Sequence, residues 1–198
     1  MGDKQELKLE RCVNVSCKEM IGRMKRIIII GNGGAGKSTL ARQLGAALHI
    51  GVTHLDSVCW KPKWMPIPES EIKTVQEPIV AQEAWIIEGN FKQTRDVCLP
   101  AADTIIFMDF PLPLCLYRIL KRHIQYAGKP RPELGEEYPE IITLNFIRRV
   151  LKYSIYTRAE VLKKIDQYAE GRKVIILRSP WQVKRFLSKF QVSEKNVQ

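Results

Sequence analysis

The chain has 198 residues, of which 45% are hydrophobic and 27% are charged, values that are ordinary for a soluble globular protein. This length suits one domain with a substantial core. No apolar run approaches the roughly 20 residues of a membrane-spanning helix, and the polar N-terminus lacks the apolar core of a secretory signal. We therefore expect a cytoplasmic protein with no membrane partner.

The net charge of +11 is distributed unevenly along the chain. From Arg118 to Arg185, 16 Lys and Arg residues stand against 7 Asp and Glu. Such a basic half can attract phosphorylated small molecules, nucleic acid or an anionic membrane surface, and charge alone does not choose among them. The five cysteines are scattered and odd in number, which favours reduced thiols over a zinc site or a disulfide framework.

Residues 1–23 mix charged and apolar side chains without a long periodicity, so we expect a flexible and dispensable N-terminal extension. The domain is predicted to span residues 24–190, and a polar tail is expected over residues 191–198. We find no internal repeat and no low-complexity segment within it.

A phosphate-binding loop is the most specific motif of the chain. An apolar strand over residues 27–30 leads into a turn that fits G-x-x-x-x-G-K-[ST] from Gly31 to Ser38, and an amphipathic helix follows. Glycines let backbone N–H groups curl around phosphates, and the new helix directs its free N–H groups at the same anion. The motif places Lys37 on the β- and γ-phosphates and Ser38 on Mg²⁺. A glycine-rich turn without a ligand is the alternative.

The second predicted strand spans residues 52–56 and ends at Asp56. In an open α/β sheet, ligands bind at the carboxyl ends of the strands. The proline-rich segment that follows is predicted to be irregular. Its tryptophans, Trp60 and Trp64, fit either a cover over an acceptor or base, or a cap on the edge of the core.

Helical periodicity returns over residues 69–83, where Pro78 predicts a kink or two short helices. The third strand is predicted over residues 85–90 and contains Glu88 near its end. A polar loop is expected over residues 92–96.

The fourth predicted strand, residues 103–109, is nearly all apolar, as expected for a strand covered on both faces, and it ends at Asp109. A helix is expected over residues 113–127. Its apolar residues share one face, while Arg118 and Arg122 lie toward another.

The last third of the chain is predicted to contain a loop or flap, two helical segments, a fifth strand and a final helix. These are expected over residues 128–139, 141–168, 173–177 and 181–190. Short apolar strands that alternate with helices predict an α/β fold, with a five-stranded parallel sheet flanked by helices on both faces.

These segments resemble the P-loop small kinases of the adenylate kinase type, and within that group the bacterial topology-modulation (FlaR-type) proteins. The resemblance covers residues 24–190. Its pieces are Ile-Gly-Asn-Gly-Gly-Ala-Gly-Lys-Ser-Thr-Leu-Ala from Ile30, His-Leu-Asp from His54, Trp-Ile-Ile-Glu-Gly-Asn from Trp85, Ala-Asp-Thr-Ile-Ile-Phe from Ala102, Leu-Lys-Arg from Leu120 and Val-Ile-Ile-Leu-Arg-Ser from Val174. It implies a P-loop NTPase fold with a basic lid at about residues 126–147, and ATP and Mg²⁺ as cofactors.

The resemblance also implies a role for each matching residue. The ATP phosphates would lie on the loop, with adenine at the turn that begins with Arg178. The expected cofactor-binding residues are Gly31, Gly33, Gly34, Ala35, Gly36, Lys37, Ser38, Thr39 and Arg178. The expected catalytic residues are Lys37, Asp56, Glu88, Arg118, Arg122 and Arg131, and the expected Mg²⁺ ligands are Ser38 and Asp56. Asn90 and Arg95 would lie near the acceptor.

Each of these roles has a structural alternative. The alternative for Asp56 and for Glu88 is a strand-end carboxylate that pairs with a nearby Lys or Arg. The arginines before and within the lid also fit a solvated basic face. The ends of three strands at Asp56, Glu88 and Asp109, followed by the basic segment, are the pattern of a small-kinase donor site.

The sequence departs from adenylate kinase at the third strand, where Glu-Gly-Asn-Phe-Lys replaces the Asp-Gly-Phe-Pro-Arg of that enzyme, and the full lid signature is absent. AMP is therefore not the expected acceptor. We expect an ATP-dependent phosphotransferase that acts on a small acceptor, either a nucleotide or another small molecule such as a sugar or a small acid. The alternative is a nucleotide-dependent DNA-binding regulator that affects DNA topology, although no helix-turn-helix or zinc finger is present.

Overall fold

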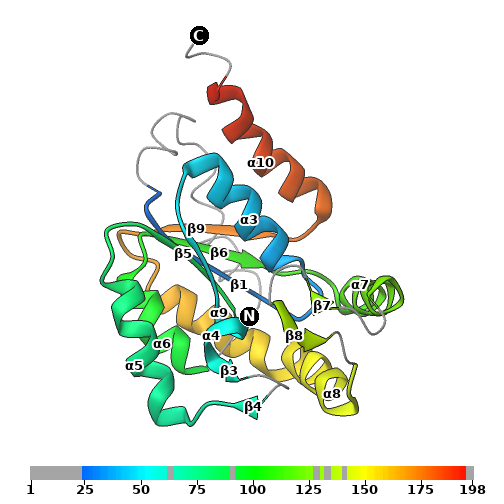
Figure 1. The fold of residues 1–198 in the computed structure, drawn as a ribbon. Helices are drawn as coiled ribbons and strands as arrows, with labels where there is room; N and C mark the ends of the chain where they lie inside the picture. Colours follow the sequence, from blue (N-terminus) through cyan, green and yellow to red (C-terminus); the bar gives the residue numbers. More distant parts are fainter. Residues whose placement is uncertain are drawn as a thin grey trace, which may run out of the picture.

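The computed structural model of the chain describes residues 24–61, 65–89, 92–126, 130–131, 135–139 and 142–194 (Figure 1). Five parallel strands form its central sheet in the order β2-β5-β1-β6-β9. In chain order they are β1 (Arg26–Gly31), β2 (Val52–His54), β5 (Trp85–Glu88), β6 (Thr104–Met108) and β9 (Lys173–Leu177). The predicted α/β fold with a five-stranded parallel sheet is therefore confirmed.

The central strand β1 is buried on both faces, because its isoleucines alternate between two hydrophobic clusters. Ile27 and Ile29 pack into one cluster, and Ile28 and Ile30 pack into the other. Helices cover both faces, as Figure 1 shows. One face carries α3 (Lys37–Leu48) and α10 (Pro180–Glu194); the other carries α5 (Glu69–Val80), α6 (Lys92–Ala101) and α9 (Arg158–Gln167).

The prediction of a polar loop over residues 92–96 was wrong, because these residues open helix α6. Arg95, Cys98 and Leu99 recur at helical spacing and are all buried. Cys98 and Leu99 pack into the same cluster as residues of α5, and this burial stabilises the helix despite its polar first turn.

Two further boundaries differ from the sequence prediction. Strand β2 ends at His54, so Asp56 lies in the first turn of the short helix α4 (Leu55–Cys59) rather than on a strand. Pro78 does not divide α5 into two helices: it lies in the last turn of one continuous helix, so few helical residues follow it.

Short antiparallel pairs occur in two segments that were expected to lack regular structure. The first pair is β3 (Trp60–Lys61) with β4 (Met65–Pro66), and the second is β7 (Pro130–Arg131) with β8 (Gly135–Pro139). Trp64 and the side chain of Trp60 lie outside the described residues, as does the N-terminal extension.

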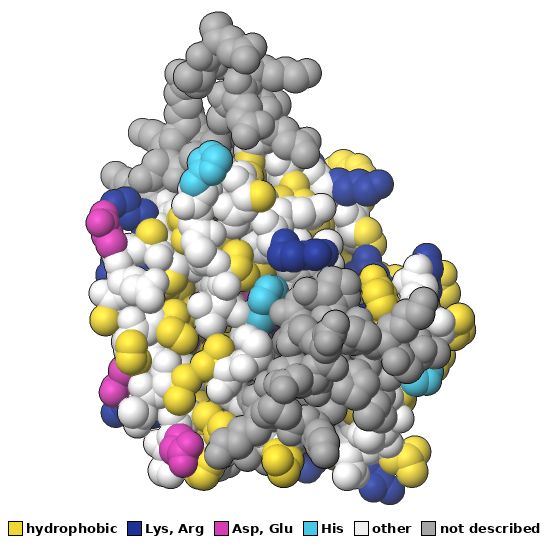
Figure 2. Space-filling view, in the orientation of Figure 1, with side chains coloured by type: hydrophobic (Ala, Val, Ile, Leu, Met, Phe, Trp, Pro, Cys, Tyr) yellow, Lys and Arg dark blue, Asp and Glu magenta, His cyan; other side chains and the backbone are white. Residues whose placement is uncertain are grey.

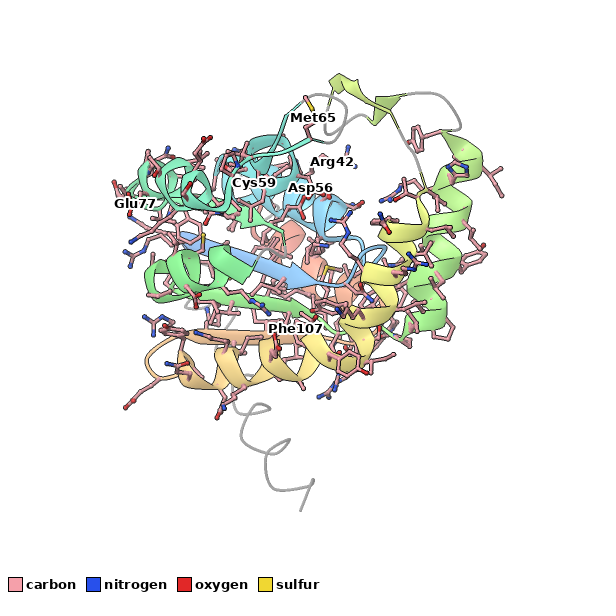
Figure 3. The ribbon with its side chains drawn as sticks, turned by 90° about the horizontal axis from the view of Figure 1, so that it is seen from below. Arg42, Asp56, Cys59, Met65, Glu77 and Phe107 are labelled. Carbon is pink, nitrogen blue, oxygen red and sulfur yellow. The ribbon has the colours of Figure 1, made fainter. Side chains whose placement is uncertain are left out.

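The expected two helical segments after the lid segment are joined into one run. Helix α8 (Leu144–Lys152) passes into a π-helical turn, η2 (Tyr153–Thr157), and then into α9. Helix α7 (Leu112–Gln125) contacts α8, and Figure 3 shows the two side by side beyond the tip of β1. The final helix runs to Glu194, past its expected end at residue 190. In the described part of the chain, no helix combines the length and the apolar character needed to cross a membrane.

Candidate phosphate-binding cavity

The glycine-rich turn joins the end of β1 to the start of α3. Gly34 and Gly36 have φ angles of 78° and 94°, in the left-handed region that favours glycine. A Cβ at Gly34 would also collide with the carbonyl oxygen of Cys115 on α7. Helix α3 begins at Lys37, so the first N–H groups of the helix have no partner within it and face the turn. The turn therefore has the geometry of an anion cradle.

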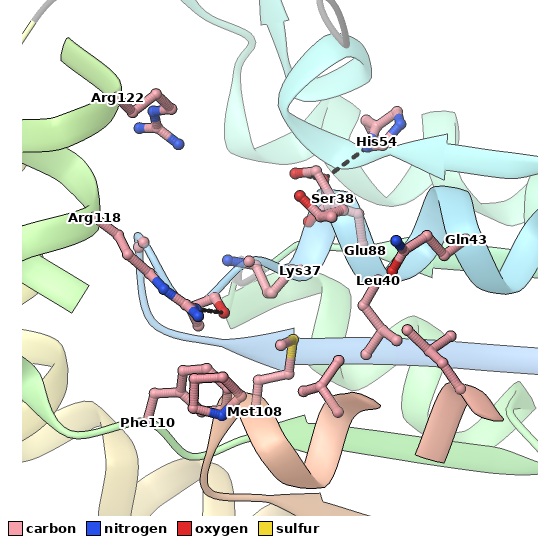
Figure 4. Close-up of a pocket in the computed structure, with 18 of the residues that line it drawn as sticks. Lys37, Ser38, Leu40, Gln43, His54, Glu88, Met108, Phe110, Arg118 and Arg122 are labelled. Carbon is pink, nitrogen blue, oxygen red and sulfur yellow. Dashed lines mark hydrogen bonds and ion pairs between the residues drawn. The ribbon is translucent and has the colours of Figure 1, made fainter. Parts of the chain in front are cut away.

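Lys37 and Ser38 project from the first turn of α3 (Figure 4). The Lys37 ammonium donates a hydrogen bond of 3.1 Å to the carbonyl oxygen of Asn32, which places it over the turn. The Ser38 hydroxyl donates a hydrogen bond of 2.9 Å to the Glu88 carboxylate at the end of β5. The β1–β5 pairing brings these residues together, because it aligns Ile29 with Glu88.

Glu88 is only 4% exposed and binds two partners with one carboxylate oxygen. It accepts the Ser38 hydrogen bond and lies 2.8 Å from Nδ1 of His54, at the end of β2. Burial opposes its charge most strongly. The hydrogen bond from His54, the positive charge of Lys37 and the hydrogen bond from Ser38 together outweigh burial, so the pKa of Glu88 is lowered from its ordinary value. Glu88 is therefore an ionised, acceptor-only group.

The turn forms part of the wall of a cavity of about 790 Å³. Side chains from eight helices and strands and from the turn share this wall, and several of them are labelled in Figure 4. The lining residues are Gly33, Gly34, Ala35, Gly36, Lys37, Ser38, Thr39, Leu40, Gln43, His54, Asp56, Glu88, Met108, Phe110, Arg118, Arg122, Phe146, Pro180, Val183, Lys184, Leu187 and Ser188. Most of the residues expected from the sequence thus meet in one place.

The basic residues expected near the lid have different positions. Arg118 donates a hydrogen bond of 2.9 Å to the carbonyl oxygen of Ala35, and its guanidinium lies 5.0 Å from the ring centre of Phe110. Arg122, one turn further along α7, lines the cavity. The side chain of Arg131 lies outside the described residues.

The end of β6 is organised by an ion pair. Asp109 accepts two hydrogen bonds of 2.7 Å from the guanidinium of Arg158, at the start of α9. Arg178, expected beside adenine, lies with its Nε 3.8 Å from the same carboxylate. The cavity wall begins two residues further on, at Pro180. Asp109 is therefore engaged in packing α9 and the β9–α10 turn against the sheet.

Several residues of the site were not singled out from the sequence for a role of their own. His54 pairs with Glu88, Gln43 and Lys184 line the cavity, and Asn32 anchors the turn through its side chain. The helical spacing of Gln43, four residues after Thr39, was the one available signal, because the others depend on strand and helix pairing. Asn90 lies outside the described residues, and Arg95 is buried with its Nη2 3.9 Å from Glu160.

The residues around Ser38 suit Mg²⁺. The Ser38 hydroxyl and the Glu88 carboxylate are oxygen donors, which are the ligands that Mg²⁺ prefers. The described residues contain no cluster of three or more His, Cys, Asp and Glu side chains that could hold a metal ion. This fits Mg²⁺ in nucleotide sites, where one or two protein groups suffice and phosphates and water complete the shell.

A scan of protein-family models and a search of curated proteins found no match to this sequence. Among solved structures, the chain is similar to a shikimate kinase from Acinetobacter baumannii in complex with shikimate, with 18% identity, a TM-score of 0.51 and coverage of 92% of this chain and 99% of that one. A sugar kinase from Janibacter sp. HTCC2649 gives 12% identity, a TM-score of 0.50 and coverage of 86% and 96%. A gluconokinase from Sinorhizobium meliloti gives 14% identity, a TM-score of 0.50 and coverage of 88% of this chain and 96% of that one. These values show a shared fold, that of small P-loop kinases.

Proposed function

We propose that the protein is an ATP-dependent phosphotransferase that moves the γ-phosphate of Mg-ATP to a small acceptor. The observation that carries this proposal is the meeting of Lys37, Ser38 and Glu88 at the glycine-rich turn of a single cavity. A volume of about 790 Å³ is within the usual range of ligand pockets.

Phosphoryl transfer depends mainly on positioning and on neutralising the charge of the moving group. In this proposal the backbone N–H groups of the turn and of the first turn of α3 hold the phosphates. Lys37 exchanges the Asn32 carbonyl for phosphate oxygens. Arg122, which already lines the cavity, adds positive charge from the α7 side.

Mg²⁺, when bound, would neutralise negative charge on the phosphates. Ser38 and Glu88 would hold it, Ser38 directly and Glu88 by orienting the Ser38 hydroxyl or through water. The Ser38 hydroxyl bonds the Glu88 carboxylate, so we propose Glu88 for the metal-side role that was expected for Asp56.

Asp56 is then the better candidate to orient the acceptor. The lowered pKa of Glu88 makes that carboxylate a weak base, and both of its hydrogen bonds commit it to Ser38 and His54. Asp56 lines the same cavity from α4, on the β2 side of the turn. In this proposal its carboxylate accepts the proton of the attacking hydroxyl group.

The acceptor is proposed to carry a hydroxyl group rather than to be AMP. The departure of Glu-Gly-Asn-Phe-Lys from the adenylate kinase motif supports this choice, and so do the names of the fold neighbours, which include a shikimate kinase, a sugar kinase and a gluconokinase. A nucleoside monophosphate remains the second acceptor class to test, because the adenylate kinase-type resemblance implies it.

The alternative, a nucleotide-dependent regulator of DNA topology, is supported by the basic second half of the sequence. On the face in Figure 2, the Lys and Arg side chains of the described residues are scattered among hydrophobic and neutral ones. DNA binding would need a continuous basic strip that follows a phosphate backbone. We rank the enzyme above the regulator because Lys37, Ser38 and Glu88 meet at the glycine-rich turn of one cavity.

The test incubates the protein with γ-labelled ATP and Mg²⁺ in the presence of sugars, small hydroxy acids and nucleoside monophosphates, with DNA binding measured at two salt concentrations. We expect transfer to one acceptor class, reduced about 100-fold or more by Lys37→Ala, which removes a cation from the phosphates. Lys163→Ala, at an exposed position of α9, is the matched control. Tight, salt-sensitive DNA binding without transfer to any acceptor would overturn the proposal.

A further inference from the structure

The side chain of Asn32, the second residue of the phosphate-binding turn, bonds to the distant helical segment that contains Val150 and Ser154. Asn32 is only 3% exposed. Its amide nitrogen donates hydrogen bonds of 3.0 Å to the carbonyl oxygen of Val150 and of 3.1 Å to the hydroxyl of Ser154. Both partners are more than a hundred residues away in the sequence, so this is a tertiary contact between the turn and the α8–η2 junction.

The other polar atoms of Asn32 hold the turn itself. Its side-chain oxygen accepts a hydrogen bond of 2.8 Å from the N–H of Gly33, and its carbonyl oxygen accepts the hydrogen bond from Lys37. One buried residue thus connects three things: the backbone of the turn, the lysine expected on the phosphates and a distant helix. A buried amide with this many partners is costly to disturb.

The partner of Asn32 is an irregular part of the helix. Val150 lies in the last turn of α8, and Ser154 lies within the π-helical turn η2, where the N–H of Arg158 bonds to the carbonyl oxygen of Tyr153, five residues earlier. Single π-turns within α-helices are frequent at functional sites.

Contacts at Gly33 show that the helix packs closely on the turn. A Cβ added there would lie 3.0 Å from a methyl group of Val150 and 3.3 Å from the ring of Phe146. Phe146 also lines the cavity. The helix therefore touches the turn through one hydrogen-bonded contact and one apolar contact.

We propose that Asn32 is a positioning residue: it fixes the phosphate-binding turn to the α8–η2 junction, so that triphosphate affinity depends on this junction and a bound triphosphate stabilises it in return. The proposal rests on the proposed function for its nucleotide half. Coupling between two sites is reciprocal. Weakening the Asn32 contacts therefore lowers both the affinity for the triphosphate and the stabilisation of the junction by bound triphosphate.

The variants are Asn32→Ala, which removes both bonds to the junction, and Ser154→Ala, which removes one and leaves the turn intact. Ser154→Thr keeps the hydroxyl and serves as the conservative rescue. Asn145→Ala, at an exposed position of α8, is the matched control for the loss of an asparagine. Each variant is studied in the full chain by calorimetric titration with ATP and Mg²⁺, and by hydrogen exchange of residues 150–157 with and without saturating ATP.

We expect Asn32→Ala to weaken ATP binding about 10-fold, within the usual range of coupling between sites. Ser154→Ala is expected to weaken it less, while Ser154→Thr and Asn145→Ala keep wild-type affinity. Saturating ATP is expected to slow hydrogen exchange of residues 150–157 in the wild type and to lose this effect in Asn32→Ala. Equal affinity and equal protection in Asn32→Ala and the wild type would overturn the proposal.

Two further results separate this proposal from the proposed function. If the wild type binds no ATP, the proposed function fails, and the contact is then judged without nucleotide. Faster exchange of residues 150–157 in Asn32→Ala supports the role of Asn32 at the junction, and unchanged exchange overturns it. If Asn32→Ala does not fold, Ser154→Ala with its Ser154→Thr rescue decides by the same measurements.

Discussion

Two acidic residues, Glu88 and Asp109, lie at the ends of the strands on either side of β1. Their carboxylates bind different kinds of partner. Glu88 is buried at the cavity and bonds the Ser38 hydroxyl and His54. Asp109 is bonded through both oxygens to Arg158, with Arg178 nearby. Both residues lie at the carboxyl ends of their strands, so that location alone does not make a carboxylate part of a site. Whether a strand-end carboxylate belongs to the site depends on the partner residue that the fold places beside it.

The largest effect that would test this contrast is expected from Glu88→Gln. Glutamine keeps the shape and can still accept the Ser38 hydrogen bond, but it removes the negative charge behind the proposed Mg²⁺ ligand. We expect ATP-dependent transfer, and the apparent affinity for Mg²⁺, to fall about 10- to 100-fold. The measurement is a Mg²⁺ titration of transfer at saturating ATP.

Asp109→Asn is the matched control in that titration, because the structure assigns its carboxylate to packing. The Mg²⁺ midpoint of Asp109→Asn is expected to equal that of the wild type. A similar shift in both variants would contradict the division of roles between the two strand ends.

The next effect is on stability and is expected at Asp109. Hydrogen bonds to charged groups contribute about 1.5–3 kcal/mol, and the side chain of Arg158 is 42% exposed, so we take the lower end for Asp109→Asn. About 1.5 kcal/mol corresponds to a loss of roughly 3–6 °C in Tm for a chain of this size. Thermal unfolding followed by circular dichroism measures it.

Arg178→Ala provides the comparison within the same ion-pair group. Its Nε lies 3.8 Å from Asp109 and its side chain is 43% exposed, so its loss is expected to cost less than about 1 kcal/mol. A large loss of ATP affinity in this variant would restore the nucleotide role expected from the sequence and break the contrast.

The smallest effect is a pH dependence from Glu88. Because its pKa is lowered in the folded protein, ionised Glu88 stabilises the fold above its ordinary pKa of 4.5, and this contribution is lost as the pH falls through the folded pKa. The Tm difference between the wild type and Glu88→Gln is therefore expected to shrink as the pH is lowered below 4.5. A difference that grows with acidity would mean that burial outweighs the hydrogen bonds.

The phosphate-binding turn and the sheet could be predicted from the sequence because their determinants are local. Gly31 to Ser38 carry a motif whose chemistry requires its spacing, and the apolar strands alternate with helices. Helix α6 was missed because its polar first turn obscured the buried residues Arg95, Cys98 and Leu99, which recur at helical spacing. The helical pattern was present in the sequence of α6, but the charged and polar residues of its first turn led to the prediction of a loop.

The use of the individual carboxylates and arginines could not be predicted, because it depends on long-range pairing. Glu88 meets His54 only because β5 pairs with β2, and Asp109 meets Arg158 only because α9 returns to the sheet. Asn32 is the clearest case, since its partners on the α8–η2 junction are distant in the sequence. Asn32 occupies a variable position of the motif, and nothing in the motif indicates these partners.

The strand order also has a consequence for how the chain folds during synthesis. β1 is the first strand in the described part of the chain, but its two neighbours in the sheet, β5 and β6, are encoded far downstream. The buried strand β1 therefore has no partner in the sheet until Glu88 has been translated and lacks its second partner until Met108, and β9 joins the sheet later still. Such delayed pairing leaves apolar strand edges exposed, which is when nascent chains aggregate and chaperones bind.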